Sequence, residues 1–167
     1  MGFTRLEMIA ECGNMGPKLA PLPKGIDGAR LLWALSGNES SYGTNCTPRH
    51  EPAFDVGGTY GDGPVMKPLL AKYGKAAACS YGPWQLMFCN APEGFTPEAF
   101  TDLHQCALAT VARLNTFLRK WQPQAIAGIG ECWNAGHPML NPVAGVAAYV
   151  HELGKNYAAL PPWAKAA

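Results

Sequence analysis

Residues 31–42 read LLWALSGNESSY, a run of five apolar residues that passes into a polar end. A helix that is apolar on every side is usually buried on every side, so this run predicts a helix inside the core. Ser36, Gly37 and Asn38 are typical of helix ends and turns. We therefore expect Glu39 to lie where a buried helix emerges into an open space.

The expected surroundings of Glu39 bear on its protonation. The last carbonyl groups of a helix carry partial negative charge, and apolar neighbours remove water; both effects raise the pKa of a carboxyl group. A carboxylic acid that keeps its proton near neutral pH can serve as a general acid. The competing interpretation is a solvated glutamate at the end of a helix.

Length and composition predict one globular domain over residues 1–167. We divide this domain into an N-terminal strap at 1–27 and a core at 28–158. Hydrophobic residues make up 48% and charged residues only 15% of the chain, which excludes a disordered protein. The net charge of +1 does not favour binding to nucleic acid or to an anionic membrane. No apolar run approaches the roughly 18 residues of a membrane span, and the N-terminus lacks the apolar segment of a signal peptide.

The cysteines leave two interpretations open. The chain has six of them, an even number that suits disulfides, yet buried free thiols fit equally well. There is no Cys-x-x-Cys motif and no Cys/His cluster with zinc spacing, so we expect neither a metal nor another cofactor.

Helical periodicity dominates the rest of the chain and predicts a mainly α (α+β) fold with a small β-hairpin or loop excursion. Thr4, Asp27 and Thr96 are expected N-caps. Glycine-rich turns between residues 57 and 63 suggest short β-strands within 46–73. Besides the helix that ends near Glu39, the expected helices cover residues 3–11, 97–121, 125–132 and 143–157.

Three short blocks occur in a fixed order. They are Glu39-Ser40, then SYGPWQLM at residues 80–87, then WNAG at residues 133–136. This order resembles the soluble lytic transglycosylase family, which shares a lysozyme-like fold with goose-type lysozymes. The stretch at 47–54 is also similar to muramidase modules of phage lysins. The resemblance covers about residues 28–158.

The resemblance implies a role for residues in each block. Glu39 matches the family's catalytic acid, which protonates the glycosidic oxygen between N-acetylmuramic acid and N-acetylglucosamine and then acts as the base that closes a 1,6-anhydro ring. Ser80 and Gln85 match residues that line the sugar cleft. The remaining substrate-binding candidates are Tyr81, Met87, Asn134 and Tyr149.

Two departures from the family pattern leave the reaction open. Trp133 replaces a tyrosine whose hydroxyl contacts the catalytic acid, and Tyr149 or Tyr157 could supply that hydroxyl instead. The long interval before Ser80 contains Asp55 and Asp62, which are candidate auxiliary catalytic acids of a hydrolase.

The interval also contains Glu51, which is a further candidate. Asp62 lies in a sequence typical of turns, and residues 49–51 could form a local ion pair.

Peptidoglycan glycan strands are the expected partner, and a lytic transglycosylase is the expected activity. A hydrolytic muramidase, a non-catalytic glycan-binding or phage structural module, and a glycosidase acting on chitin-type polymers are the alternatives. We expect a monomer that works outside the cytoplasm, in the periplasm or cell wall, or that is delivered by a phage or prophage.

Overall fold

The fold is mainly helical with one small antiparallel sheet, as predicted for a mainly α (α+β) class. The computed structural model describes residues 2–159 and 161, so both extreme ends of the expected single domain lie outside the described residues. The helices are α1 (Arg5–Met15), α2 (Gly28–Ser40), α3 (Met66–Tyr73), α4 (Leu103–Trp121), α5 (Ile126–Ala135) and α6 (Ala144–Ala158). The strands are β1 (Arg49–His50), β2 (Cys79–Tyr81) and β3 (Leu86–Met87).

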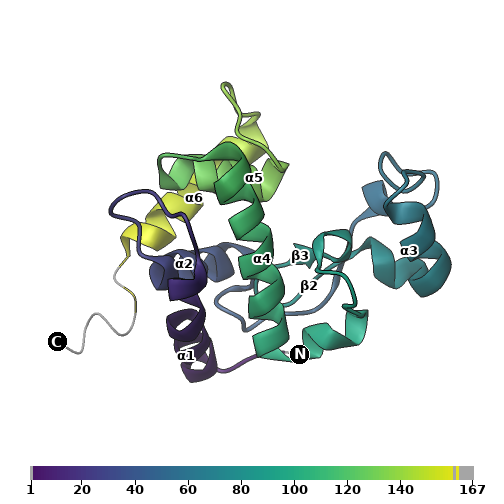
Figure 1. The fold of residues 1–167 in the computed structure, drawn as a ribbon, viewed down its shortest axis with the longest axis horizontal. Helices are drawn as coiled ribbons and strands as arrows, with labels where there is room; N and C mark the ends of the chain where they lie inside the picture. The colour runs from purple at the N-terminus through teal and green to yellow at the C-terminus, as the bar shows by residue number, and fades with distance from the viewer. Residues whose placement is uncertain (1, 160, 162–167) are drawn as a thin grey trace.

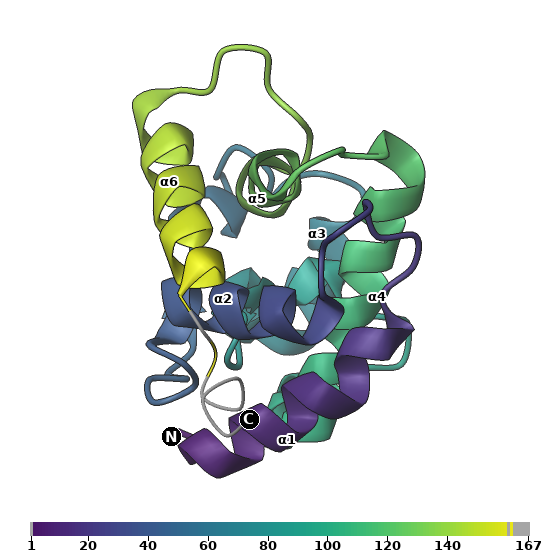
Figure 2. The ribbon, with the colours of Figure 1, turned by 90° about the vertical axis from the view of Figure 1, so that its left-hand side faces the viewer.

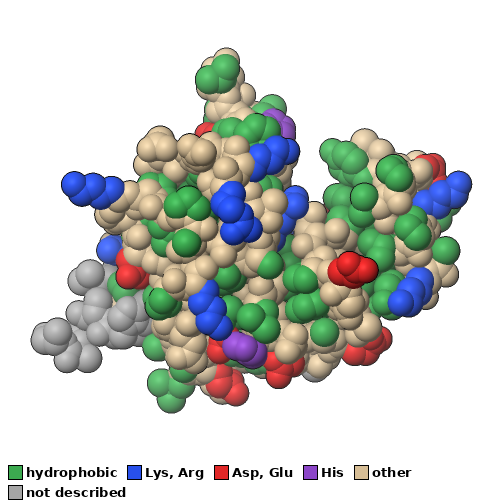
Figure 3. Space-filling model, in the orientation of Figure 1, with side chains coloured by type: hydrophobic (Ala, Val, Ile, Leu, Met, Phe, Trp, Pro, Cys, Tyr) green, Lys and Arg blue, Asp and Glu red, His purple; other side chains and the backbone are tan. Residues whose placement is uncertain are grey.

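The helices form a body from which a smaller lobe projects. Helix α4 runs through the middle of Figure 1, with α1 and α2 on one side and α5 and α6 above them. The sheet lies on the other side of α4 and leads to α3, which projects away from the body (Figure 1). Turned by 90°, the view shows α2 crossing the body between α1 and α6 (Figure 2). The space-filling view shows an open hollow between the body and the α3 lobe (Figure 3).

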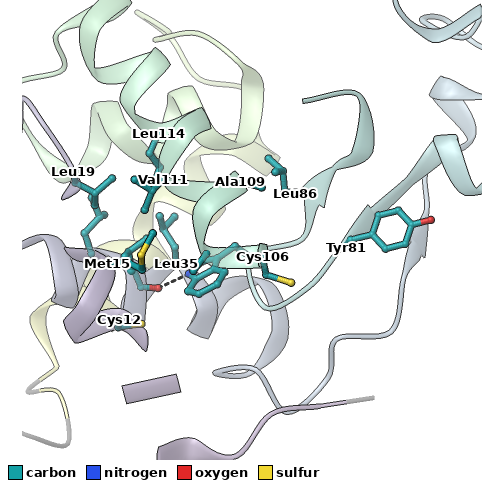
Figure 4. Packing of buried hydrophobic residues seen from close by; sticks show 14 of the residues in the cluster. Cys12, Met15, Leu19, Leu35, Tyr81, Leu86, Cys106, Ala109, Val111 and Leu114 are labelled. Carbon is teal, nitrogen blue, oxygen red and sulfur yellow. Dashed lines mark hydrogen bonds between the residues drawn. The ribbon is translucent and has the colours of Figure 1, made fainter. Parts of the chain in front are cut away.

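Helix α2 is the buried helix that the sequence predicts. Its residues 31–36 are all buried, and its N-cap is Asp27, whose side chain accepts from Arg30 N. Trp84 is fully buried against it and donates from Nε1 to Leu32 O at 2.8 Å. Figure 4 shows Leu35 in the same cluster as Met15 and Val111, which come from α1 and α4. Each such aliphatic side chain contributes roughly 1.5–3 kcal/mol when fully buried.

Helices α1 and α2 meet through two glycines. A Cβ on Gly28 would lie 2.2 Å from Gly16 O, and a Cβ on Gly16 would lie 2.3 Å from Ala29 N. Only hydrogen fits on either side of this backbone contact. The contact places the end of α1 and the segment that follows it directly against the start of α2.

Residues 46–73 form the loop excursion, which is one of the two expected forms, and not the hairpin. The glycine-rich part of that stretch forms turns, and an unpredicted helix, α3, follows it. Only β1 is extended there; it pairs with β2, which in turn pairs with β3, both antiparallel. Strand β1 therefore finds its partner about thirty residues further along, with Arg49 opposite Ser80.

Several helix boundaries differ from the prediction. Helix α1 continues past Gly13 because a helical glycine with open space around it does not interrupt the backbone pattern. Helix α4 begins at Leu103 because Asp102, rather than Thr96, caps it by accepting from Gln105 N. Residues 97–101 form a separate 3-10 helix. The later helices run one to three residues beyond their predicted C-terminal ends.

All six cysteines lie within the described residues, and all six are free thiols. Burial raises the pKa of Cys12 and of Cys106 to about 12, so both are protonated and unreactive at neutral pH. Across the described residues, no helix combines the length and the apolar character needed to cross a membrane.

The glycine contact between α1 and α2 makes a prediction about stability. Gly28→Ala is expected to lower the free energy of unfolding by about 1–3 kcal/mol, because the new methyl group overlaps a backbone oxygen. Gly13→Ala is the matched control. It adds the same methyl group to an open helical position and should stabilise by about 0.5–1 kcal/mol. Urea denaturation measures both, and equal effects of the two variants would contradict the close contact.

Candidate active site

Glu39 lies in the last turn of α2, at the edge of a cavity of about 280 Å³. Its side chain is partly buried, as expected where a buried helix emerges. We call this space the Glu39 cavity. It is lined by Glu39, Asn45, Thr47, Pro48, Arg49 and Gln85.

Two hydrogen-bond donors hold one oxygen of Glu39. The Tyr149 hydroxyl donates to Oε1 at 2.8 Å, and Trp133 Nε1 donates to the same oxygen at 3.0 Å. Of Tyr149 and Tyr157, the two residues expected to supply a hydroxyl, it is therefore Tyr149 that contacts Glu39, and the indole of Trp133 is a second donor. Because an indole N–H only donates, Oε1 remains an acceptor and the proton of the neutral acid belongs on Oε2.

The pKa of Glu39 is raised, and opposing effects set it. Burial raises it most, and the charge of Glu51 raises it further. The hydrogen bond from Tyr149, the charge of Arg49 and the hydrogen bond from Trp133 act in the opposite direction, since each favours the ionised form. A carboxyl group in this setting can release a proton and take one back, which is the requirement for general acid and base catalysis.

Ser40 secures the end of α2 beside Glu39. Its side chain is 3% exposed, and its hydroxyl donates to Pro83 O at 2.6 Å while accepting from Gly43 N at 2.9 Å. The Glu-Ser block is thereby joined to the turn at the centre of residues 80–87. This contact restricts the backbone that carries Glu39.

A second set of contacts joins the end of α2 to α6. Asn38 donates from Nδ2 to Tyr149 O at 3.1 Å and accepts at Oδ1 from Asn156 Nδ2 at 2.6 Å. The Tyr42 hydroxyl donates to Asn156 Oδ1 at 3.0 Å. Asn38 thus binds the backbone of Tyr149, and the hydroxyl of Tyr149 binds Glu39. These contacts position the acid and its hydrogen-bond donor together.

Gln85, in the turn between β2 and β3, is hydrogen-bonded to Ser80 of β2. Gln85 lines the Glu39 cavity and donates from Nε2 to Gly82 O at 3.0 Å. The Ser80 hydroxyl lies 3.0 Å from Gln85 Oε1 and 3.3 Å from Glu51 Oε1. Gln85 therefore lines the cavity, whereas Ser80 is buried against Gln85 and Glu51 and does not line it.

Arg49 and Glu51 also belong to the site. The sequence predicts no site role for Arg49 and offers Glu51 only as a further candidate acid. Arg49 lines the cavity, and its Nε lies 2.6 Å from Glu51 Oε1. The local ion pair considered for residues 49–51 is present, and both of its charges act on Glu39. The signal was the spacing of two residues, which places both side chains on one face of an extended segment.

The two predicted auxiliary acids do not line the Glu39 cavity. Asp55 Oδ2 lies 2.8 Å from His50 Nε2. Asp55 lines a different cavity, of about 350 Å³, next to α3. Asp62 is exposed and lies 3.5 Å from Gly57 N within a turn. Both follow β1 into the α3 lobe, because this part of the chain folds as turns and not as the expected hairpin.

Tyr81 is also held away from the cavity. It is 8% exposed, its ring stacks on Phe100 with centroids 5.2 Å apart, and its hydroxyl donates to Ala76 O. Its position is that of a core residue.

Met87 is half-buried opposite Ser80 in the sheet, and Asn134 is exposed on α5 beside Trp133. Among the described residues, no group of three or more His, Cys, Asp or Glu side chains could hold a metal ion.

The raised pKa of Glu39 predicts a pH-dependent effect of Glu39→Gln on stability. The folded protein keeps the proton at pH values where the unfolded chain loses it, so the contribution of Glu39 is complete below about pH 4.3 and lost as pH rises through the folded-state pKa. Glutamine does not titrate. The free energy of unfolding of Glu39→Gln should therefore rise relative to wild type as pH increases from about 4.3 through the folded-state pKa of Glu39.

Denaturant titrations over this pH range measure that difference. Glu93→Gln, at an exposed loop carboxylate, is the control for a general change of charge. If the Glu39 variant loses stability relative to wild type as pH rises, the pKa of Glu39 is lowered and not raised.

The two donors predict a graded change in the pKa of Glu39. Tyr149→Phe and Trp133→Phe each remove a hydrogen bond that favours the ionised form, so both should raise this pKa, the tyrosine variant more. NMR titration of the Glu39 side-chain carboxyl carbon measures it. Tyr157→Phe, which removes a hydroxyl that accepts from Asp27 N, should leave it unchanged. An unchanged pKa in Tyr149→Phe would exclude this hydrogen bond.

Comparison with known proteins finds no matching family model, no matching curated protein and no matching solved structure. The chemistry of the site is therefore inferred from the residues around Glu39.

Proposed function

We propose that this protein cleaves the glycan strands of peptidoglycan between N-acetylmuramic acid and N-acetylglucosamine as a lytic transglycosylase. The observation that carries the proposal is that the three sequence blocks meet at the end of α2, where Glu39 and Ser40 lie. The first block supplies the acid, the second contacts Ser40 through Pro83 O, and the third donates from Trp133 to Glu39. Segments about 40 or more residues apart along the chain therefore meet at the end of α2 that carries Glu39.

In the proposed reaction Glu39 acts twice. Its Oε2 gives a proton to the glycosidic oxygen as the bond to the muramoyl C1 breaks. The resulting carboxylate takes the proton of the muramoyl 6-hydroxyl as that oxygen bonds to C1, which closes the 1,6-anhydro ring and restores the acid. Burial favours the first step, and the donors Tyr149 and Trp133 stabilise the ionised state between the two steps.

Hydrolysis is the second candidate, and Glu51 is the observation that favours it. Its charge acts on Glu39, so a second carboxylate lies within electrostatic reach of the acid. In an inverting glycosidase such a carboxylate positions the attacking water. Glu51 takes the place that the sequence assigned to Asp55 or Asp62.

Because peptidoglycan is the proposed substrate, the proposed place of action is the periplasm or cell wall, with delivery by a phage or prophage as the other route.

Digestion of purified peptidoglycan, with mass spectrometry of the product ends, tests the proposal. Anhydro ends are expected, and Glu39→Gln should lower the rate by at least about 100-fold, the contribution of a general acid. Asp62→Asn is the matched control on the same polymer and should keep the wild-type rate. Products that Glu39→Gln releases at the wild-type rate would refute the role of Glu39.

Glu51→Gln separates the two reactions. New reducing ends that disappear in Glu51→Gln would establish the hydrolase. Anhydro ends formed by both wild type and Glu51→Gln would establish the transglycosylase. Binding of strands without any product would identify a glycan-binding module, and products from chitin oligomers alone would identify a different glycosidase.

A further inference from the structure

Arg49 presents an unused hydrogen-bonding edge to the Glu39 cavity. Its side chain is 58% exposed and lines the cavity from β1. Within the described part of the chain, its guanidinium hydrogen-bonds only Glu51, and it does so through Nε. The Nη1 and Nη2 groups are therefore available. A guanidinium binds a carboxylate through two parallel N–H donors, and these two groups provide such a pair.

The cavity contains no other cationic side chain among its lining residues. Asn45, Thr47, Pro48 and Gln85 are uncharged, and Glu39 is neutral when it carries its proton. Glu51 pairs with Arg49 through a single contact to Nε at 2.6 Å, and this contact does not use the Nη1 and Nη2 groups. A neutral polymer would leave the free edge of Arg49 without a partner of opposite charge, whereas an anionic one would satisfy it.

We propose that Arg49 forms a carboxylate-binding subsite that selects glycans with an acidic substituent next to the bond that Glu39 cleaves. The identity of that glycan rests on the proposed function: in peptidoglycan the acidic substituent is the lactyl carboxylate of a peptide-free muramoyl sugar, or a carboxylate of the peptide attached to it. Chitin-type strands have the same N-acetylated sugars without this group. Arg49 thus distinguishes the two polymers.

Binding measurements test the subsite without requiring cleavage. The protein is Glu39→Gln, in which a neutral amide replaces the protonated acid. Isothermal titration calorimetry compares peptide-free strands, the same strands with their lactyl carboxylates converted to amides, and chitin oligomers of equal length. The carboxylate strands should bind roughly 5- to 10-fold more tightly than the amidated strands, as for a charge-assisted hydrogen bond at a partly exposed site.

Substitution of Arg49 in the same background should abolish that difference. Arg49→Gln should weaken binding of the carboxylate strands to the level of the amidated strands and leave the amidated strands and chitin oligomers unchanged. Arg49→Lys keeps the charge without the paired donors, so it should retain part of the preference. Lys67→Gln is the matched control, because it removes one positive charge from an exposed position on α3 outside the cavity.

Peptide-bearing strands distinguish the two sources of the carboxylate, because their lactyl group is already an amide. Arg49-dependent binding of these strands identifies the peptide carboxylates, and its restriction to peptide-free strands identifies the lactyl group. Equal weakening of all strands by Arg49→Gln, equal affinity for carboxylate and amidated strands, or no binding at all would overturn the subsite. Arg49-dependent binding together with an inactive wild-type protein would leave the subsite standing and refute the proposed cleavage.

Discussion

Helix α2 presents apolar side chains on every side, and the rest of the protein is arranged to cover it. Its residues 31–35 are buried, so a layer must lie against each face. Helices α1 and α4 and the turn that carries Trp84 supply part of that cover, and α6 completes it. The close approach of Gly16 and Gly28 is one consequence of this demand for close packing.

The position of Glu39 follows from the same constraint. A helix that is held on all faces is a rigid support, and its last turn projects a carboxyl group to a defined place. The cover then determines the chemistry of that group. Packing buries Glu39 and removes water from it, whereas Trp133 of α5 and Tyr149 of α6 donate hydrogen bonds to Oε1. Burial and hydrogen bonding act on the pKa of this carboxyl group in opposite directions, and burial is the larger effect, so the pKa is raised.

The second structural layer, the sheet and the residues before it, gives the site its charge. Strand β1 places Arg49 at the cavity and Glu51 beside it, and the turn between β2 and β3 brings Gln85 to the cavity, where Gln85 contacts Ser80. The proposed selection of an acidic glycan and the choice between the two reactions both depend on this one short strand. In contrast, Asp55 lines a separate cavity next to α3, and Asp62 lies exposed in a turn.

Local patterns were sufficient for much of the fold. The cap at Asp27, the apolar stripe of α4 and the mainly α class depend on neighbours within a few residues. The sequence does not predict helix α3, although Met66, Leu69, Leu70 and Tyr73 have helical spacing. The helix is only 8 residues long and follows a glycine-rich stretch, which is typical of turns. The strand pairing of β1 was missed because strands of two and three residues leave too short a pattern to identify partners.

By itself, the sequence determined that α2 would be buried and that Glu39 would stand at its end, since both depend on hydrophobicity and helix signals within one segment. Only the tertiary structure decided what surrounds this carboxyl group. Trp133 and Tyr149 lie 94 and 110 residues from Glu39 along the chain. From the sequence, Glu51 was one of three equivalent candidate acids, and the fold places its charge, and not those of the other two, where it acts on Glu39. The physical reason is that hydrogen bonds and charges act through distances in space, which a one-dimensional pattern does not contain.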